Sequence, residues 1–86
     1  MIIDKTVMNN LKKILAAVVN VPAANIDNDK SMVIYGIDSI KIIVMLQKIN
    51  KKFNVDLKAG DILTHATLCS LAALIQEQQN HTHPAL

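Results

Sequence analysis

The stretch that most constrains the fold is the run of apolar residues that follows Ser39. Its side chains recur at intervals of three or four, which predicts an α-helix over residues 39–52. The helix is apolar on more than one face, and a chain of 86 residues can hardly bury all of it, so part is expected to remain exposed for contacts with partners. The residues assigned to its core-facing stripe are Ile42, Ile43, Leu46, Ile49 and Phe53.

Two further segments show the same repeat. Residues 4–19 predict the first helix, with Asp4 or Thr6 as its N-cap and Pro22 beyond its end. The last helix is expected to start with Thr67 as N-cap and to fade near Gln79. The stripes expected to be buried are Val7, Leu11, Ile14, Leu15 and Val18 in the first helix, and Leu68, Leu71, Ala72 and Ile75 in the last.

Two connections join these helices. Residues 20–38 mix turn formers with apolar residues, and a connection of this length in a compact domain tends to be functional. We expect it to lie across the helices, anchored by Ile26 and Met32. Residues 54–66 are expected to include a short helical turn that starts near Ala59. The side chains expected to face inward from this turn are Ile62 and Leu63.

These elements predict an all-α fold, a small three-to-four-helix bundle with a long loop between the first and second helices. Only two Gly and two Pro occur, which favours helices over a turn-rich β fold. The expected domain covers residues 1–79. The polar residues 80–86 are expected to form a disordered C-terminal tail.

Composition excludes several classes of function. The net charge is +2 and the chain contains no Arg, which is weak support for nucleic-acid binding. No signal peptide is visible, and no stretch approaches the ~20 apolar residues that span a bilayer. We therefore expect a soluble, cytoplasmic monomer that binds neither nucleic acid nor membrane.

Catalytic and metal chemistry find little support in the sequence. Cys69 is the single cysteine, so it has no internal disulfide partner, and a free cysteine is most simply a small buried thiol. His65, His81 and His83 lack ligand spacing on a defined element, so no metal site is expected. Because no set of nucleophile, base and orienting group is present, we do not expect the chain to be an enzyme.

The most distinctive local pattern is the tetrad Gly36-Ile37-Asp38-Ser39 at the start of the second helix. Gly36 can adopt a positive φ, and Asp38 is well placed to cap the helix. Ser39 would then be exposed in the first turn, where free N–H groups and the helix dipole favour an anion. On these residues alone the tetrad is also compatible with an ordinary helix start.

The layout of residues 7–77 resembles the acyl carrier protein family, the phosphopantetheine-bearing carriers of fatty acid, polyketide and nonribosomal peptide synthesis. The hallmark of this family is Gly-x-Asp-Ser followed by Leu or Ile at the head of the second helix. The residues that carry the resemblance are Gly36-Ile37-Asp38-Ser39-Ile40, Ile26-Asp27-Asn28-Asp29, Met32, Phe53-Asn54-Val55-Asp56-Leu57, Thr67-Leu68 and Leu71-Ala72.

The resemblance implies a function for Ser39. This residue would carry a 4'-phosphopantetheine arm, installed from coenzyme A by a phosphopantetheinyl transferase, with Asp38 and Gly36 completing the attachment site. The thiol of the arm would hold an acyl group as a thioester. The chain would present this group to the acyl-loading, condensing and tailoring enzymes of an assembly line.

The sequence also departs from the family pattern. Fatty-acid carriers usually have an acidic second helix, whereas residues 40–55 contain four lysines and no acid. This favours a carrier of a polyketide or hybrid polyketide/nonribosomal peptide pathway. A peptidyl or aminoacyl carrier and a non-covalent helical interaction module are the alternatives. The residues expected to contact partners are Ile40, Lys41, Val44 and Lys48, although exposed lysines are also compatible with a merely solvated face.

Overall fold

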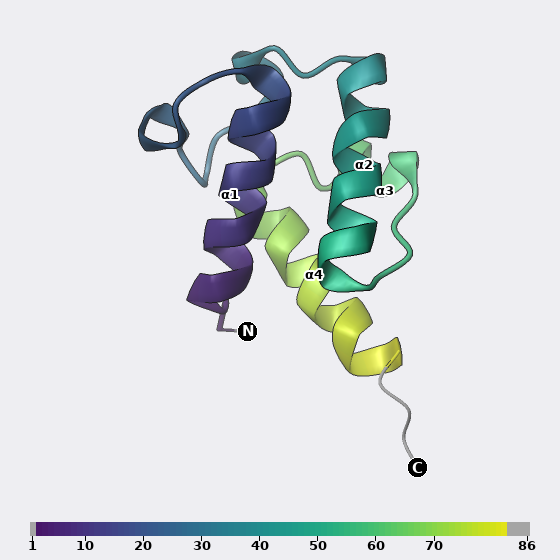
Figure 1. Ribbon diagram of the computed structural model, residues 1–86. Helices are drawn as coiled ribbons and strands as arrows, with labels where there is room; N and C mark the ends of the chain where they lie inside the picture. The colour runs from purple at the N-terminus through teal and green to yellow at the C-terminus, as the bar shows by residue number, and fades with distance from the viewer. Residues whose placement is uncertain (1, 83–86) are drawn as a thin grey trace.

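The computed structural model describes residues 2–82, and side chains through Asn80. It contains four α-helices, with a long connection between the first two, as the sequence predicts (Figure 1). Helices α1 and α2 lie side by side, α4 packs against α1, and the short α3 packs against α2. The elements in chain order are α1 (Lys5–Val19), the 3₁₀ turns η1 (Ala23–Asn25) and η2 (Met32–Tyr35), α2 (Ser39–Phe53), α3 (Ala59–Thr64) and α4 (Leu68–Thr82).

Side-chain and backbone caps define where the helices begin and end. Asp4 is the N-cap of α1, and its carboxylate accepts the N–H of Thr6 at 2.7 Å. Asn20 and Asn54 end α1 and α2 in the left-handed conformation, with φ values of 57° and 55°. Asparagine tolerates this conformation better than most residues, so the two asparagines stop the helices at these points.

The core lies where α1, α2 and α4 meet. The stripe predicted for α4 is confirmed, because all four of its residues are fully buried. Burying aliphatic side chains of this size contributes roughly 1.5–3 kcal/mol each. The largest side chains with less than 2% of their surface exposed are Leu11, Leu15, Met32, Met45, Ile49, Leu57, Leu68, Leu71 and Ile75.

The stripe predicted for α2 is partly wrong. Met45 is fully buried, whereas Ile43 is 54% exposed and Leu46 is only partly buried against the core. The rows 42–45–49–53 and 42–46–49–53 both advance by three or four residues, so periodicity alone does not separate them. In the structure the row that contains Met45 joins the core formed with α1 and α4.

The other helices show smaller departures. In α1, Met8 and Val19 are buried, whereas the predicted Ile14 and Val18 are partly buried at the edge of the core. In α3, Ile62 is buried but Leu63 is 67% exposed, because adjacent residues of a helix point about 100° apart. Helix α4 continues to Thr82, so residues 80–82 of the expected tail are helical; residues 83–86 lie outside the described residues.

The long connection is held against the bundle by the predicted anchors. Ile26 and Met32 are both buried, with 4% and 1% of their surface exposed. A further hydrogen bond closes the loop on itself, since the N–H of Asp27 donates to the Tyr35 hydroxyl at 2.6 Å. The loop is therefore an ordered part of the fold that carries the chain to the start of α2.

Hydrogen bonds tie the same loop to the connection between α3 and α4 and to the first turn of α4. The N–H of Met32 donates to the carbonyl of Ala66 at 2.8 Å, and the N–H of Cys69 donates to the carbonyl of Asn28 at 3.1 Å. Ser31 and Thr67 form an isolated antiparallel bridge at this point. None of the helices in the described part of the chain is long and apolar enough to cross a membrane.

Candidate functional site

Ser39 is the first residue of α2, and its side chain is exposed. The preceding residue, Asp38, is extended (φ −134°) and caps the helix. Its carboxylate accepts the N–H of Lys41 at 2.9 Å, and its carbonyl accepts the N–H of Ile42 at 2.8 Å. The bond to Ile42 is the first regular bond of the helix, and the bond to Lys41 satisfies one of the four N–H groups that every helix leaves unpaired at its start.

Among the N–H groups that remain, those of Ser39 and Ile40 in the first turn have no acceptor among the described residues. They lie at the positive end of the α2 dipole, where an anion is stabilised by typically 0.3–1 kcal/mol. A phosphodiester on the Ser39 oxygen would lie beside these donors. The exposed hydroxyl and the free donors therefore fit a phosphate-linked group.

Gly36 and Lys41 hold the corner that precedes the helix. Gly36 ends η2 in the left-handed region (φ +92°, ψ 21°), and its N–H donates to the carbonyl of Val33 at 3.0 Å. The ammonium of Lys41 donates to the Gly36 carbonyl at 3.2 Å and lies 3.9 Å from the second oxygen of Asp38. Lys41 therefore supports the tetrad rather than extending freely into solvent.

Replacing Gly36 with alanine is expected to lower the free energy of unfolding by about 1–2 kcal/mol, because a side chain is strained at this φ. The new Cβ would meet no atom within 4 Å, so the cost comes from the backbone alone. Gly60, on α3, is the matched control, since its Cβ would also meet nothing and its backbone is helical. Gly60→Ala is expected to stabilise the protein by roughly 0.5–1 kcal/mol. Urea denaturation of both variants measures the difference, and equal effects would contradict the assigned strain.

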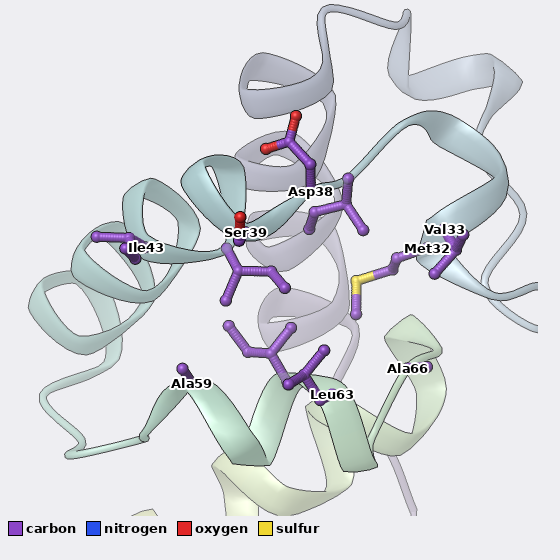
Figure 2. A pocket seen from close by; sticks show the side chains of 11 residues that line it. Met32, Val33, Asp38, Ser39, Ile43, Ala59, Leu63 and Ala66 are labelled. Atoms are coloured by element: carbon purple, nitrogen blue, oxygen red, sulfur yellow. The ribbon is translucent and has the colours of Figure 1, made fainter.

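An apolar groove of about 400 Å³ begins beside Ser39 and runs between α2, α3 and η2. Figure 2 shows side chains from all three elements converging below Ser39, with the carboxylate of Asp38 pointing away from them. Ile43 and Leu63, which the sequence assigned to the core, form part of this lining, which explains their exposure. The lining residues are Met32, Val33, Ile37, Asp38, Ser39, Ile42, Ile43, Ala59, Ile62, Leu63 and Ala66.

The residues expected to contact partners fall into two groups. Ile40 and Val44 are 73% and 38% exposed, and with Lys48 they occupy an outward face of α2. Lys41 instead folds back onto the tetrad, as described above. The groove itself was missed by sequence reasoning. One sequence signal pointed to it: Ile43 and Leu63 each follow an isoleucine that already faces the core, so a second apolar side chain is left over at each position.

Cys69 and His65 are not among the residues that line the groove beside Ser39. The Cys69 thiol donates to the Asp29 carboxylate at 3.2 Å. Burial raises the pKa of this thiol above its ordinary value, and the hydrogen bond to Asp29 raises it further, so the neutral form is favoured. His65 Nδ1 lies 3.1 Å from the Asp61 carbonyl, and the side chains of His81 and His83 fall outside the described residues. Within the described residues, no three His, Cys, Asp or Glu side chains cluster to hold a metal.

Comparison with protein families identifies the class to which this fold and site belong. The family described as "Phosphopantetheine attachment site" (PP-binding) matches residues 9–75, most of the chain, and the chain therefore belongs to this family. It is a carrier domain without catalytic activity of its own, and its prosthetic group is 4'-phosphopantetheine. The resemblance found in the sequence is confirmed.

Two solved structures have the same fold. One is the solution structure of a non-covalent extended docking domain complex of the Pax NRPS (PaxA T1-CDD/PaxB NDD). It is 19% identical, with a TM-score of 0.85 over 98% of this chain and 79% of that chain. The other is the NMR structure of the HMG-ACPI domain from the CurA module of Lyngbya majuscula. It is 28% identical, with a TM-score of 0.78 over 87% of this chain and 77% of that one. They confirm the predicted helical bundle. No curated protein sequence matches the chain.

Proposed function

We propose that Ser39 is the residue that carries the 4'-phosphopantetheine arm. The observation that supports this most directly is the position of its hydroxyl, exposed at the start of α2 beside two free N–H groups. The chain has two other serines. Ser31 accepts the N–H of Val33 at 3.3 Å as the cap of η2, and Ser70 is partly buried on α4. Only Ser39 combines exposure with an anion-favouring setting.

Loading would join the Ser39 oxygen to the phosphorus of the arm. The bond from that phosphorus to the nucleotide part of coenzyme A would break, and the serine proton would leave with a base of the transferase. The chain positions the serine and favours negative charge beside it. Asp38 fixes the start of the helix, and the N–H groups would stabilise the new phosphodiester. When bound, the arm supplies a thiol that holds an acyl group as a thioester.

The cargo proposed for this arm is an acyl intermediate of a polyketide or hybrid polyketide/nonribosomal peptide assembly line. Two observations support this. The HMG-ACPI domain is 28% identical, and α2 carries lysines where fatty-acid carriers usually carry acids. The partners would be a phosphopantetheinyl transferase and the acyl-loading, condensing and tailoring enzymes of the pathway. The likeness to the Pax NRPS structure keeps a peptidyl or aminoacyl carrier as the second candidate.

The proposal is tested by incubating the protein with coenzyme A and a permissive phosphopantetheinyl transferase. The intact mass should rise by one phosphopantetheinyl group, and peptide mapping should place the group on Ser39. Intact-mass measurement of protein from its native host should then reveal the cargo, with an aminoacyl group favouring the second candidate. An unmodified mass with several transferases would favour a non-covalent interaction module instead.

Ile40→Asp is expected to slow acyl transfer by a partner enzyme while leaving the fold intact. Ile40 is 73% exposed, so a charge there disturbs a docking face rather than the core. A loss of about tenfold in kcat/KM corresponds to one well-buried apolar contact at an interface. Lys30→Asp, on the exposed part of the first loop, is the control that also adds negative charge. Thermal unfolding checks the fold, and unchanged transfer by Ile40→Asp would remove Ile40 from the interface.

A further inference from the structure

Charge is distributed very unevenly over this protein. Helices α1 and α2 carry seven of the nine lysines and none of the seven acidic residues. The acids lie in the caps, the connections, α3 and α4, so the net charge of +2 conceals two strongly basic helices. The lysines of these two helices are Lys5, Lys12, Lys13, Lys41, Lys48, Lys51 and Lys52.

Four of these lysines surround a second hollow, between α1 and α2, of about 450 Å³. Ile14 and Ala17 of α1 form its apolar floor, and Asn10 completes the α1 side. The two helices lie side by side here (Figure 1). We call this feature the lysine groove; its lysines are Lys13, Lys48, Lys51 and Lys52.

The lysine groove has no acidic partner within the described residues. Among residues 2–82, the ion pairs join Lys41 to Asp38 and Lys58 to Asp56, and both lie outside the groove. Four ammonium groups around one hollow repel each other, and a bound group with negative charge would relieve that repulsion. Charge complementarity therefore calls for an acidic occupant.

We propose that the lysine groove binds an acidic amphipathic helix of a partner protein. A hollow between two packed helices matches the surface of a third helix, and helix-in-groove binding pairs an apolar stripe with flanking charges. One apolar stripe of the partner would pack on Ile14 and Ala17. Carboxylates on either side of that stripe would face Lys13 from α1 and Lys51 from α2.

Other occupants fit this groove less well. A nucleic acid would make little use of the apolar floor, and the chain has no Arg for bidentate phosphate contacts. A second copy of the chain has no suitable helix among its described elements. Helices α1 and α2 contain no acid, α3 contains only Asp61, and α4 contains only Glu77.

The groove lies beyond the attachment site along the same helix. Lys48 is nine residues from Ser39, about 14 Å along the axis of α2 at 1.5 Å per residue. A helix in the groove would thus hold the carrier while the start of α2 stays accessible. This deepens the proposed function by giving the partner's chemistry, and it rests on that proposal only in taking the partner to be an enzyme that uses the arm.

The test uses the ¹⁵N-labelled protein and a synthetic amphipathic helix with a stripe of Leu that is flanked by Glu on both sides. Amide shifts should concentrate at residues 10–17 and 48–52. Lys13→Glu/Lys51→Glu should weaken binding by about tenfold or more. Lys5→Glu/Lys30→Glu, an equal change of net charge outside the groove, should weaken it by about twofold at most. Ala17→Gln, which fills the floor without changing charge, should also weaken binding and covers the case in which the double variant fails to fold.

Several results would overturn the inference. These are shifts spread over all exposed lysines, equal weakening by the control variant, or binding to the same peptide with Lys in place of Glu. Vesicles containing phosphatidylglycerol form a parallel arm, and capture by vesicles without peptide binding would assign the lysines to a lipid surface. Ser39→Ala should still bind the peptide, so failure of the groove and failure of the attachment proposal give different results.

Discussion

Ser39→Ala is expected to abolish loading of the phosphopantetheine arm completely. The substitution removes the oxygen that would form the phosphodiester and leaves the rest of the start of α2 in place, because Asp38 caps the helix through Lys41 and Ile42. Ser39 is exposed and makes no hydrogen bond through its side chain to another described residue, so stability should change by less than about 0.5 kcal/mol. Intact-mass measurement after incubation with coenzyme A and a transferase reads the result.

The other two serines are the controls for this experiment. Ser70→Ala and Ser31→Ala should load as the wild type does, although loss of the Ser31 cap can cost about 1 kcal/mol of stability. Residual loading of Ser39→Ala would place the attachment elsewhere. Equal loss of loading in all three variants would instead indicate a damaged fold, which circular dichroism distinguishes.

The largest expected effect on stability is that of Met45→Ala. Met45 has none of its surface exposed, so truncation leaves a cavity at the centre of the bundle and costs roughly 2–5 kcal/mol. Leu46→Ala should cost clearly less, because Leu46 is only partly buried at the edge of the same core. Urea denaturation measures both, and a small bundle of this size has little stability to lose.

The pair of variants also tests how α2 is rotated. The sequence assigned Leu46 to the core, and a larger effect of Leu46→Ala than of Met45→Ala would mean that this assignment was right. Met45→Leu nearly conserves the side-chain volume and should cost less than about 1.5 kcal/mol. Comparison with Met45→Ala therefore separates the effect of lost packing from the effect of losing the thioether.

The helices and the Gly36–Ser39 tetrad could be predicted because local chemistry determines their conformation. Asp38 caps the helix, and Gly36 adopts the positive φ expected of it. The long loop is anchored by Ile26 and Met32, the two apolar residues chosen from the sequence. For the cap and the glycine, a residue type and its immediate neighbours are sufficient to define the structure, without knowledge of how the helices pack.

The remaining features depend on tertiary packing and could not be predicted. The exposure of Ile43 and Leu63 follows from the position of α3 beside α2, and no local pattern encodes that contact. The apolar groove beside Ser39 exists only because both residues face it. The lysine groove is similar, because Lys13 and Lys51 are far apart in sequence and are brought together when α1 packs on α2.

One hydrogen bond has a consequence for how the groove beside Ser39 can widen. The N–H of Met32 is bound to the carbonyl of Ala66, and both residues line that groove. The long loop at Met32 and the segment that follows α3 are therefore held together at this point. Any widening of the groove would therefore come from the Ala59 end of α3, which lines the groove and lies beyond the reach of this hydrogen bond. A group that enters the groove would then be accommodated at the start of α3 rather than at the long loop.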